Sequence, residues 1–531
     1  MKNIIFITIA LFTASFAFSQ SKFSIRSYSG SDSNDHLSEL VDFQQFTSLS
    51  KRIYYNIALF NSFNTSTNRN NLKLVILYDD GVIENSYEIS HAVSSFSASQ
   101  MVLDSGIVYI VGNIISQGSS EQNVFILKFD FQTRQLQKSF LVQSKDYHIA
   151  NPKMVINDNL YLAHEYNSKT NTKEPSGIVL TSFSKDLKLQ WSQRYFFDSS
   201  YSVNIQNLIL SPNQTLLLSC LTQQKGAIEN RIRILDLDIH GIKTRCSELR
   251  YYNSDRTYEF RTGRSFLAKN GSNIHLVSQA FVGRSDAGPI LVTMIDTSLT
   301  LRTWRNYTPT LRIESFSIAD SSFIFCGQAP VANGLEGYGF LRINASNAIP
   351  QKESYIKDGF RNFSIASSGS AHFQNGKRNY IMVAKPNEGE HFSVAVFDRS
   401  ILHACEEPAK TSVSKDPVTL SPVDIKSAPN DLNISTETQT TVQEIQFTDR
   451  IQCEVNSISD PESLSYTIQN KSLYFQTEMD VLLCVDLKGR VISKAYNSHT
   501  IQLPRNIPSG LFIIQTIAKN KIRSFKLLLT E

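Results

Sequence analysis

The sequence predicts an all-β protein, built from a seven-bladed β-propeller followed by a small C-terminal Ig-like β-sandwich. Three observations lead to this prediction. Alternating apolar strand patterns run along most of the chain, one strand phrase recurs seven times at nearly constant spacing, and turn residues separate the strands. With 531 residues the chain is too long for one ordinary core, so a repeat architecture or several domains is expected.

The N-terminus has the pattern of an export signal. Lys2 precedes an apolar run over residues 4–18, and small residues follow at Ala17 and Ser19. This pattern is typical of a signal peptide at residues 1–19, with cleavage between Ser19 and Gln20. The run is too short to span a bilayer comfortably, so we expect a mature protein that is exported and not membrane-spanning.

Residues 20–405 contain the repeats. Each copy is an apolar strand that ends in Asp, Asn or Ser. The copies are residues 75–79, 126–130, 180–184, 234–238, 292–296, 339–344 and 394–398. Their last residues are 48 to 58 positions apart. A short turn and another strand follow, with Trp191 and Trp304 in nearly equivalent places.

A second phrase, a polar turn that opens into an apolar strand, precedes most copies. The turns are at residues 104–106, 157–159, 212–214, 269–271, 320–322 and 374–376. Asn, Asp and Gly suit such turns because they tolerate positive φ, so we expect hairpins here.

Three or four strands in about 50 residues match one propeller blade, a unit that must stack on neighbours to bury both faces. We expect residues 23–28 to join the last blade and close the ring, which removes an exposed sheet edge. A row of separate sandwich domains is the alternative, but sandwiches need about 100 residues each.

The copies resemble the β-propeller repeats of secreted bacterial proteins, whose phrase runs from an apolar strand through Asp and Gly to a Trp-Ser strand. Residues 179–183 with Trp191 and Ser192 match best, and residues 124–130 match the strand half. The resemblance covers residues 50–405, although only Gly81 and Gly241 keep the usual turn glycine. It implies a fold and no particular activity.

Residues 406–456 interrupt the repeat. Ser, Thr, Pro and Asp become frequent, which predicts a linker with one or two strands of its own. Cys405 and Cys453 bracket this segment, and the hypothesis is that they form a disulfide, which would add about 3–4 kcal/mol to stability. The sequence leaves the pairing of the six cysteines open, and cysteines within apolar strands, such as Cys326 and Cys484, fit small buried hydrophobes.

Residues 457–531 form a compact run of strand patterns joined by turns, as in a small β-sandwich. Three phrases stand in order: residues 485–491 with Asp486, Gly489 and Arg490, residues 507–514 with Gly510 and Phe512, and residues 525–528 with Lys526. The first has the form Asp-x-x-Gly-Arg, and the second follows Gly with an aromatic residue and an apolar strand.

These phrases resemble the type A sorting domain of the Bacteroidetes type IX secretion system. Two departures are Asp460-Pro461 in place of the opening Asn-Pro, and Phe512 in place of Tyr. The resemblance implies recognition by the outer-membrane translocon and by its C-terminal processing peptidase. It further implies an extracellular or outer-membrane surface location after periplasmic transit, the protein being either released or attached to lipopolysaccharide. The alternative is an ordinary Ig-like stabilising domain.

Composition and motifs limit the function. The 52 basic and 48 acidic residues are scattered, without the basic stripe that nucleic acid selects. The sequence has no nucleophile elbow, zinc helix or phosphate loop, and we expect no cofactor. Asp236, Asp238, His240 and Gly241 have a calcium-loop spacing, but Leu237 and Ile239 between them favour a strand that runs into a turn.

The leading hypothesis is therefore a non-catalytic propeller that binds a glycan, a polymer or a protein partner at the cell surface. The second is an extracellular enzyme that degrades polysaccharide or peptide, with its site in the propeller channel, where residues from different blades meet without a linear motif. The third is a structural surface component such as an adhesin.

Overall fold

The computed structural model is all-β. It describes residues 22–29, 34–46, 52–78, 81–119, 121–170, 174–198, 201–224, 230–253, 256–257, 259–270, 273–282, 286–308, 312–319, 322–331, 335–344, 350–356, 372–375, 379–384, 392–398, 406–408, 412–414, 418–430, 432–436, 439–446, 448–456, 466–469, 472–485, 491–503, 510–518 and 521–529. These residues form strands and turns and no helix. Ile25–Gln452 is one compact unit, and the described residues of Met1–Ser24 and Cys453–Glu531 belong to a second.

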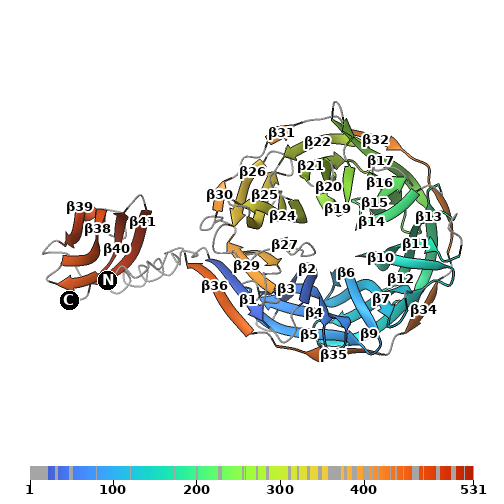
Figure 1. Cartoon of the computed structure of the whole chain (residues 1–531), viewed down its shortest axis with the longest axis horizontal. Coiled ribbons are helices and arrows are strands. Elements are labelled where there is room, and N and C mark those ends of the chain that lie inside the picture. The colour runs from blue at the N-terminus through green and yellow to red at the C-terminus, as the bar shows by residue number, and fades with distance from the viewer. Residues whose placement is uncertain are drawn as a thin grey trace, which may run out of the picture. The chain divides into compact units, whose positions relative to one another are not determined.

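Within the first unit, antiparallel sheets follow one another in chain order around a ring (Figure 1). The first sheet contains β2 (Asn34–Phe46), β3 (Arg52–Asn64), β4 (Arg69–Tyr78) and β5 (Ile83–His91). The second contains β6 (Ser94–Asp104), β7 (Ile107–Ser116), β8 (Gln122–Asp130) and β9 (Gln135–Gln143). The third contains β10 (Tyr147–Ile156), β11 (Asn159–Ser168), β12 (Gly177–Ser184) and β13 (Leu189–Phe196).

The fourth sheet contains β14 (Tyr201–Leu210), β15 (Leu216–Gln224), β16 (Asn230–Leu237), β17 (Lys243–Asn253) and the short β18 (Arg256–Thr257). The fifth contains β19 (Glu259–Asn270), β20 (Asn273–Val282), β21 (Asp286–Ile295) and β22 (Leu301–Thr308). The sixth contains β23 (Arg312–Ala319), β24 (Ser322–Val331), β25 (Leu335–Asn344) and β26 (Pro350–Ile356). The seventh contains β27 (His372–Asn375), β28 (Asn379–Ala384), β29 (Phe392–Asp398) and β1 (Lys22–Ser29).

The recurring phrase of the sequence is the third strand of each sheet. β4, β8, β12, β16, β21, β25 and β29 end at or next to the polar residue of each copy. The expected equivalence of Trp191 and Trp304 is wrong by one residue. Trp191 lies opposite Ser182, one residue before Phe183, whereas Trp304 lies opposite Thr293, two residues before Ile295, so the two side chains are on opposite faces of their sheets.

The turns expected at residues 104–106, 157–159 and 212–214 are confirmed, with positive φ at Ser105 and Gln214. The other three expected turns include residues 271, 320, 321 and 376, which lie outside the described residues.

The first and seventh sheets are neighbours. β1 lies beside β29, as expected for residues 23–28. The Tyr28 hydroxyl donates a 2.6 Å hydrogen bond to the carbonyl of Gly81, in the β4–β5 turn of the first sheet. Tyr195 makes the same bond from the third sheet to Gly241 of the fourth. β2 also contacts β27, so the seventh sheet meets the first as the third meets the fourth.

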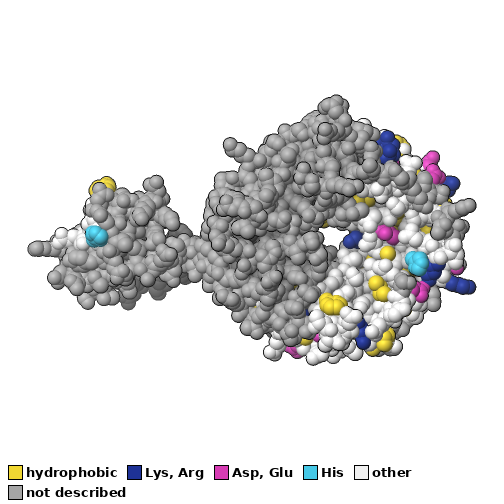
Figure 2. All heavy atoms as spheres, viewed as in Figure 1, with side chains coloured by type: hydrophobic (Ala, Val, Ile, Leu, Met, Phe, Trp, Pro, Cys, Tyr) yellow, Lys and Arg dark blue, Asp and Glu magenta, His cyan; other side chains and the backbone are white. Residues whose placement is uncertain are grey.

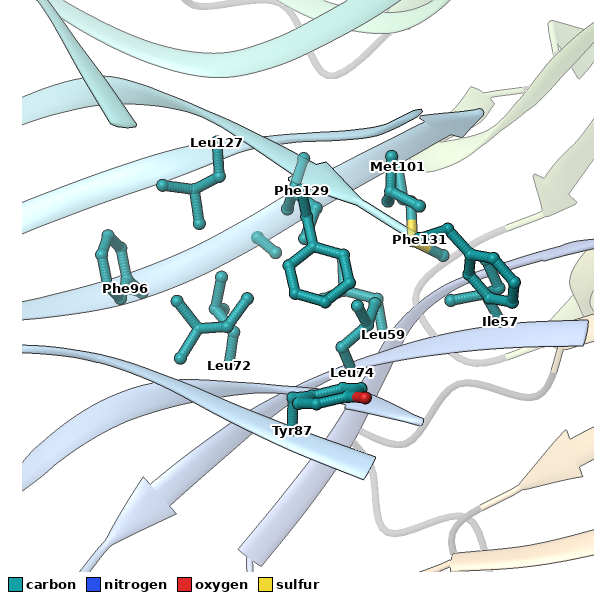
Figure 3. Close-up of a cluster of buried hydrophobic side chains, with 14 of the residues drawn as sticks. Ile57, Leu59, Leu72, Leu74, Tyr87, Phe96, Met101, Leu127, Phe129 and Phe131 are labelled. Atoms are coloured by element: carbon teal, nitrogen blue, oxygen red, sulfur yellow. The ribbon is translucent and has the colours of Figure 1, made fainter. Parts of the chain in front are cut away.

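The core is divided into clusters between adjacent sheets. Figure 3 shows one of them, where Leu59 and Leu74 of the first sheet meet Leu127 and Phe129 of the second. Alternate residues of one strand enter different clusters: Leu127 faces the first sheet, whereas Ile126 packs with residues of the third sheet. A third strand is thus apolar on both faces, which explains its continuous apolar sequence.

Residues 406–456 differ from the expected linker with one or two strands. They contain seven strands, each the outer partner of one sheet's fourth strand. These strands are β30 (Glu406–Pro408), β31 (Ser412–Ser414), β32 (Val418–Pro422), β33 (Lys426–Pro429), β34 (Asn433–Thr436), β35 (Thr440–Glu444) and β36 (Thr448–Asn456). They follow the ring in reverse order, from the sixth sheet down to the first and then to the seventh (Figure 1). We call residues 406–456 the belt.

The second unit contains one described sheet. It has the order β37 (Tyr466–Gln469), β38 (Ser472–Val485), β40 (Gly510–Ala518) and β41 (Lys521–Leu529), and β39 (Val491–Gln502) pairs with β38. Two expected strand pairs are merged, because β38 and β39 each continue through a register irregularity. The two-sheet sandwich stays a prediction.

Candidate functional site

The first strand of each sheet lies nearest the centre of the ring (Figure 1). Six of these strands, β2, β6, β10, β14, β19 and β23, have a register shift against the second strand of the same sheet. Such a bulge leaves main-chain groups without a ladder partner and re-aims side chains. Repeated bulges therefore place polar groups toward the central opening, and Figure 2 shows a basic surface at the described edge of this opening.

Polar side chains connect the bulges of adjacent sheets. At three consecutive junctions a side chain accepts a hydrogen bond from a main-chain N–H of the next sheet's first strand. The pairs are Asn61 Oδ1 with the Ala98 N–H, Gln100 Oε1 with the Met154 N–H, and Glu165 Oε1 with the Ile205 N–H, all at 2.7 Å. Two of the three acceptors are neutral carboxamides, and the third is a carboxyl group.

Glu165 is held from both sides of its junction. Besides Ile205 of β14, the Nδ2 of Asn151 donates to Glu165 Oε1 at 2.8 Å. Asn151 lies in the bulge of β10 and has a φ of 54°, a conformation that Asn tolerates better than most residues. Both hydrogen bonds involve Oε1, and the side chain is partly exposed.

Burial raises the pKa of Glu165 from 4.5 to about 7, although the bonds from Asn151 and Ile205 and the charge of Lys153 act in the opposite direction. The neighbouring His164 points to the other face of β11 and is fully buried. Burial lowers the pKa of His164 to about 4, so its imidazole is neutral at physiological pH.

Further polar side chains lie on the next sheet. Gln206 and Asn207 follow Ile205 directly, and Asn207 lies opposite Ser219 of β15. Gln206 Oε1, Asn207 Oδ1 and Ser219 Oγ are buried without a hydrogen-bond partner among the described residues. Such groups normally have a partner, since an unpaired buried polar atom costs about 1–3 kcal/mol.

The arrangement combines a carboxyl group that is readily protonated with carboxamide and hydroxyl groups. These groups both donate and accept hydrogen bonds when the carboxyl is protonated. Chemically they suit an uncharged, hydroxyl-bearing ligand, or a proton transfer near neutral pH. The signal that sequence reasoning missed is a single carboxylate, Glu165, which follows the apolar residues 160–163 and His164 in β11.

The calcium-like spacing has a structural role. Asp238 Oδ1 accepts hydrogen bonds from the main-chain N–H groups of His240 and Ile242, both at 2.8 Å. Asp296 makes the same two bonds in the next sheet. The interpretation as a strand that runs into a turn is confirmed, and the carboxylate caps that turn.

The sequence-predicted sorting and processing residues are only partly described. Ser19, Gln20, Cys405, Asp486, Gly489 and Arg490 lie outside the described residues. Gly510 and Phe512 lie on β40 and Lys526 on β41, and these strands pair with each other, Ile513 opposite Lys526. Cys453 lies on β36. The second and third sorting phrases are therefore adjacent strands, while the first and the disulfide hypothesis stay untested.

Among residues whose side chains are described, Cys220, Cys246 and Cys484 are buried free thiols, which confirms the expectation for Cys484. The described side chains contain no group of three metal-ligating residues. No helix long and apolar enough to cross a membrane occurs in the described part of the chain.

No family model and no curated protein matches the chain. Solved structures to which the chain is similar include the polysaccharide lyase Uly1, at 8% identity and a TM-score of 0.43, covering 65% of this chain and 88% of that one. A putative 6-phosphogluconolactonase from Bacteroides fragilis has 12% identity and a TM-score of 0.33, covering 78% and 99%. The β-1,2-mannobiose phosphorylase of Listeria innocua has 9% identity and a TM-score of 0.28, covering 58% and 92%.

Proposed function

We propose that this chain is an exported binding protein whose seven sheets are the blades of a propeller, with a ligand site at the central opening beside Glu165. Support for the seven blades comes from the repeated four-strand sheets and from the contact of β2 with β27. The ligand class is a hydroxyl-rich, uncharged glycan. The carrying observation is that Glu165, on the second strand of its sheet, stands where the first sheet has the carboxamide of Asn61.

A neutral amide is sufficient to accept the main-chain hydrogen bond, as Asn61 and Gln100 do. The carboxyl group at the third junction is costlier, because the raised pKa means that ionisation is unfavourable there. The protonated carboxyl of Glu165 donates a hydrogen bond to a sugar hydroxyl, while its Oε1 still accepts the hydrogen bond from the Ile205 N–H. Binding then requires the neutral carboxyl and weakens as pH rises through about 7.

Affinity electrophoresis in gels that contain neutral polysaccharides tests this role at pH 6 and pH 8.5. We expect wild-type retardation to weaken about tenfold at the higher pH, equivalent to about 1.4 kcal/mol or one good hydrogen bond. Glu165→Gln keeps a neutral donor and should bind equally at both pH values, whereas Glu165→Ala should bind weakly at both. Equal retardation of all three proteins at both pH values would exclude Glu165 from the site.

An extracellular polysaccharide- or peptide-degrading enzyme is the second candidate, favoured by one observation. A carboxyl with a pKa of about 7 suits general acid or base catalysis near neutral pH. Release of reducing ends, unsaturated products or free amines from polymers incubated with wild type, and its loss in Glu165→Gln, would establish catalysis. Retardation in gels without product release would leave the binding role.

Export by the type IX secretion system, with an Ig-like sorting domain at residues 457–531, completes the proposal. The pairing of β40 with β41 supports it by bringing the phrases around Gly510, Phe512 and Lys526 together. Deletion of residues 457–531, followed by fractionation of cells that have this system, should leave the protein in the periplasm. Undiminished export of the truncated protein would refute the sorting role.

A further inference from the structure

The belt is bound to the ring mainly through the main chain. β30 to β35 pair antiparallel with the fourth strands of six sheets, for example Val418–Pro422 along β17 and Thr440–Glu444 along β5. Each of these strands is only three to five residues long. Main-chain pairing of this kind accepts many sequences, so the edges select an extended chain and not a particular motif.

Apolar side chains of the belt anchor it at intervals. Ile425 is 7% exposed and belongs to the cluster between the third and fourth sheets. The other anchors pack against the same or further clusters, one or two at each: Leu420, Val423, Leu432, Ile434 and Val442. Their spacing matches the steps between sheets, so the belt and the ring form a series of short contacts.

The contacts between successive belt strands and their sheets bind the belt strongly together, although each contact alone is weak. Each belt strand makes a few main-chain hydrogen bonds to its sheet, with one or two apolar anchors nearby. Because one chain joins the strands, each bound strand raises the effective concentration of the next one at its own edge. Such a segment detaches one strand at a time, while the repeat strands of each sheet stay folded. Detachment would leave a row of unpaired fourth-strand edges, which is a ready template for another extended chain.

We infer that these fourth-strand edges form a binding site for an extended chain, filled here by the chain's own belt, and that the belt of a second copy can occupy the same site. A second copy fits best because its belt has the same register and anchor spacing. The belt is joined to the ring by residues 399–405, between β29 and β30. Exchange of an identical element between copies changes no contact.

The test uses the full, folded chain with a protease sequence inserted between Asp398 and Glu406. After cutting, the fragment that begins at Glu406 should co-elute with the ring in gel filtration, because the edges hold it without a covalent link. Mixing with an isotope-labelled, equally cut copy should then produce mixed complexes in native mass spectra over hours. Far-UV circular dichroism before and after cutting checks that the sheets persist.

Matched substitutions make the outcome specific to the belt. Ile425→Asp removes the buried anchor and should accelerate exchange at least tenfold. Ile242→Asp places the same charge on a 65% exposed residue of the β16–β17 turn and should leave the rate unchanged. Immediate loss of the fragment on cutting, absence of mixed complexes after days, or equal rates in the two variants would each overturn the proposal.

Discussion

The repeat strands and the belt strands have the same secondary structure for different reasons. In β15 and β16, Leu218 and Ile234 are fully buried, and apolar residues cover both faces of the sheet. In the belt, β33 has exposed and partly exposed residues only, and its single buried neighbour, Ile425, comes just before it. A repeat strand is specified by its own burial, whereas a belt strand depends on an edge that others have built.

This comparison predicts that a substitution in a repeat strand gives the largest loss of stability. Leu218→Ala in β15 removes a fully buried side chain between two sheets and should lower the free energy of unfolding by about 4 kcal/mol. Urea unfolding followed by tryptophan fluorescence measures it. A loss below about 1 kcal/mol would mean that the cluster repacks freely, which contradicts close packing between the sheets.

The second largest loss of stability is expected for a turn between two repeat strands. Gly241 has a φ of 79°, and a Cβ there would lie 2.6 Å from the ring of Trp191. Gly241→Ala should therefore cost about 3 kcal/mol, from backbone strain and from displacement of the ring.

Gly118 is the matched control, because its φ is 78° but a Cβ would meet nothing within 4 Å. Gly118→Ala should cost only about 1 kcal/mol. Equal losses in thermal or urea unfolding would show that the contact with Trp191 contributes nothing.

The hydrogen-bonded Glu165 should affect stability in a pH-dependent way. Because the folded pKa of Glu165 is raised to about 7, the unfolded chain binds fewer protons between pH 4.5 and 7, and the wild type loses stability as pH rises through this range. Glu165→Gln should match the wild type at pH 4.5 and exceed its stability by about 2 kcal/mol at pH 8. Parallel stability curves across this range, from urea titrations at each pH, would contradict a raised pKa.

The belt should show the smallest effect on global stability. Ile425→Ala removes one anchor of a segment that forms only the outermost strands of the sheets, so we expect a loss of about 1 kcal/mol in ring unfolding. Limited proteolysis should nevertheless cut the belt several times faster than in the wild type. A loss as large as that of Leu218→Ala would mean that belt and ring unfold as one unit.

The same contrast explains what sequence reasoning found and missed. Third strands such as β4 were predictable because residues 74–77 are continuously apolar, and Asp238 marked a turn that it caps itself. The belt was not predictable, since Ser, Thr and Pro are frequent in it and its partner strands lie far away in the sequence, as Glu444 does from Tyr87. Glu165 was visible as the one carboxylate of its strand, but only the fold brings Asn151 and Ile205 to it.

Hydrogen–deuterium exchange of the uncut chain tests the central claim most directly, namely that ring edges hold the belt in strand pairing. Amides of residues 418–446 should exchange at least about a hundredfold more slowly than in a free peptide of this sequence, yet faster than those of β12 and β16. Ile425→Asp should speed exchange in the belt alone. Belt amides that exchange at the free-peptide rate, beside a protected ring, would contradict the account.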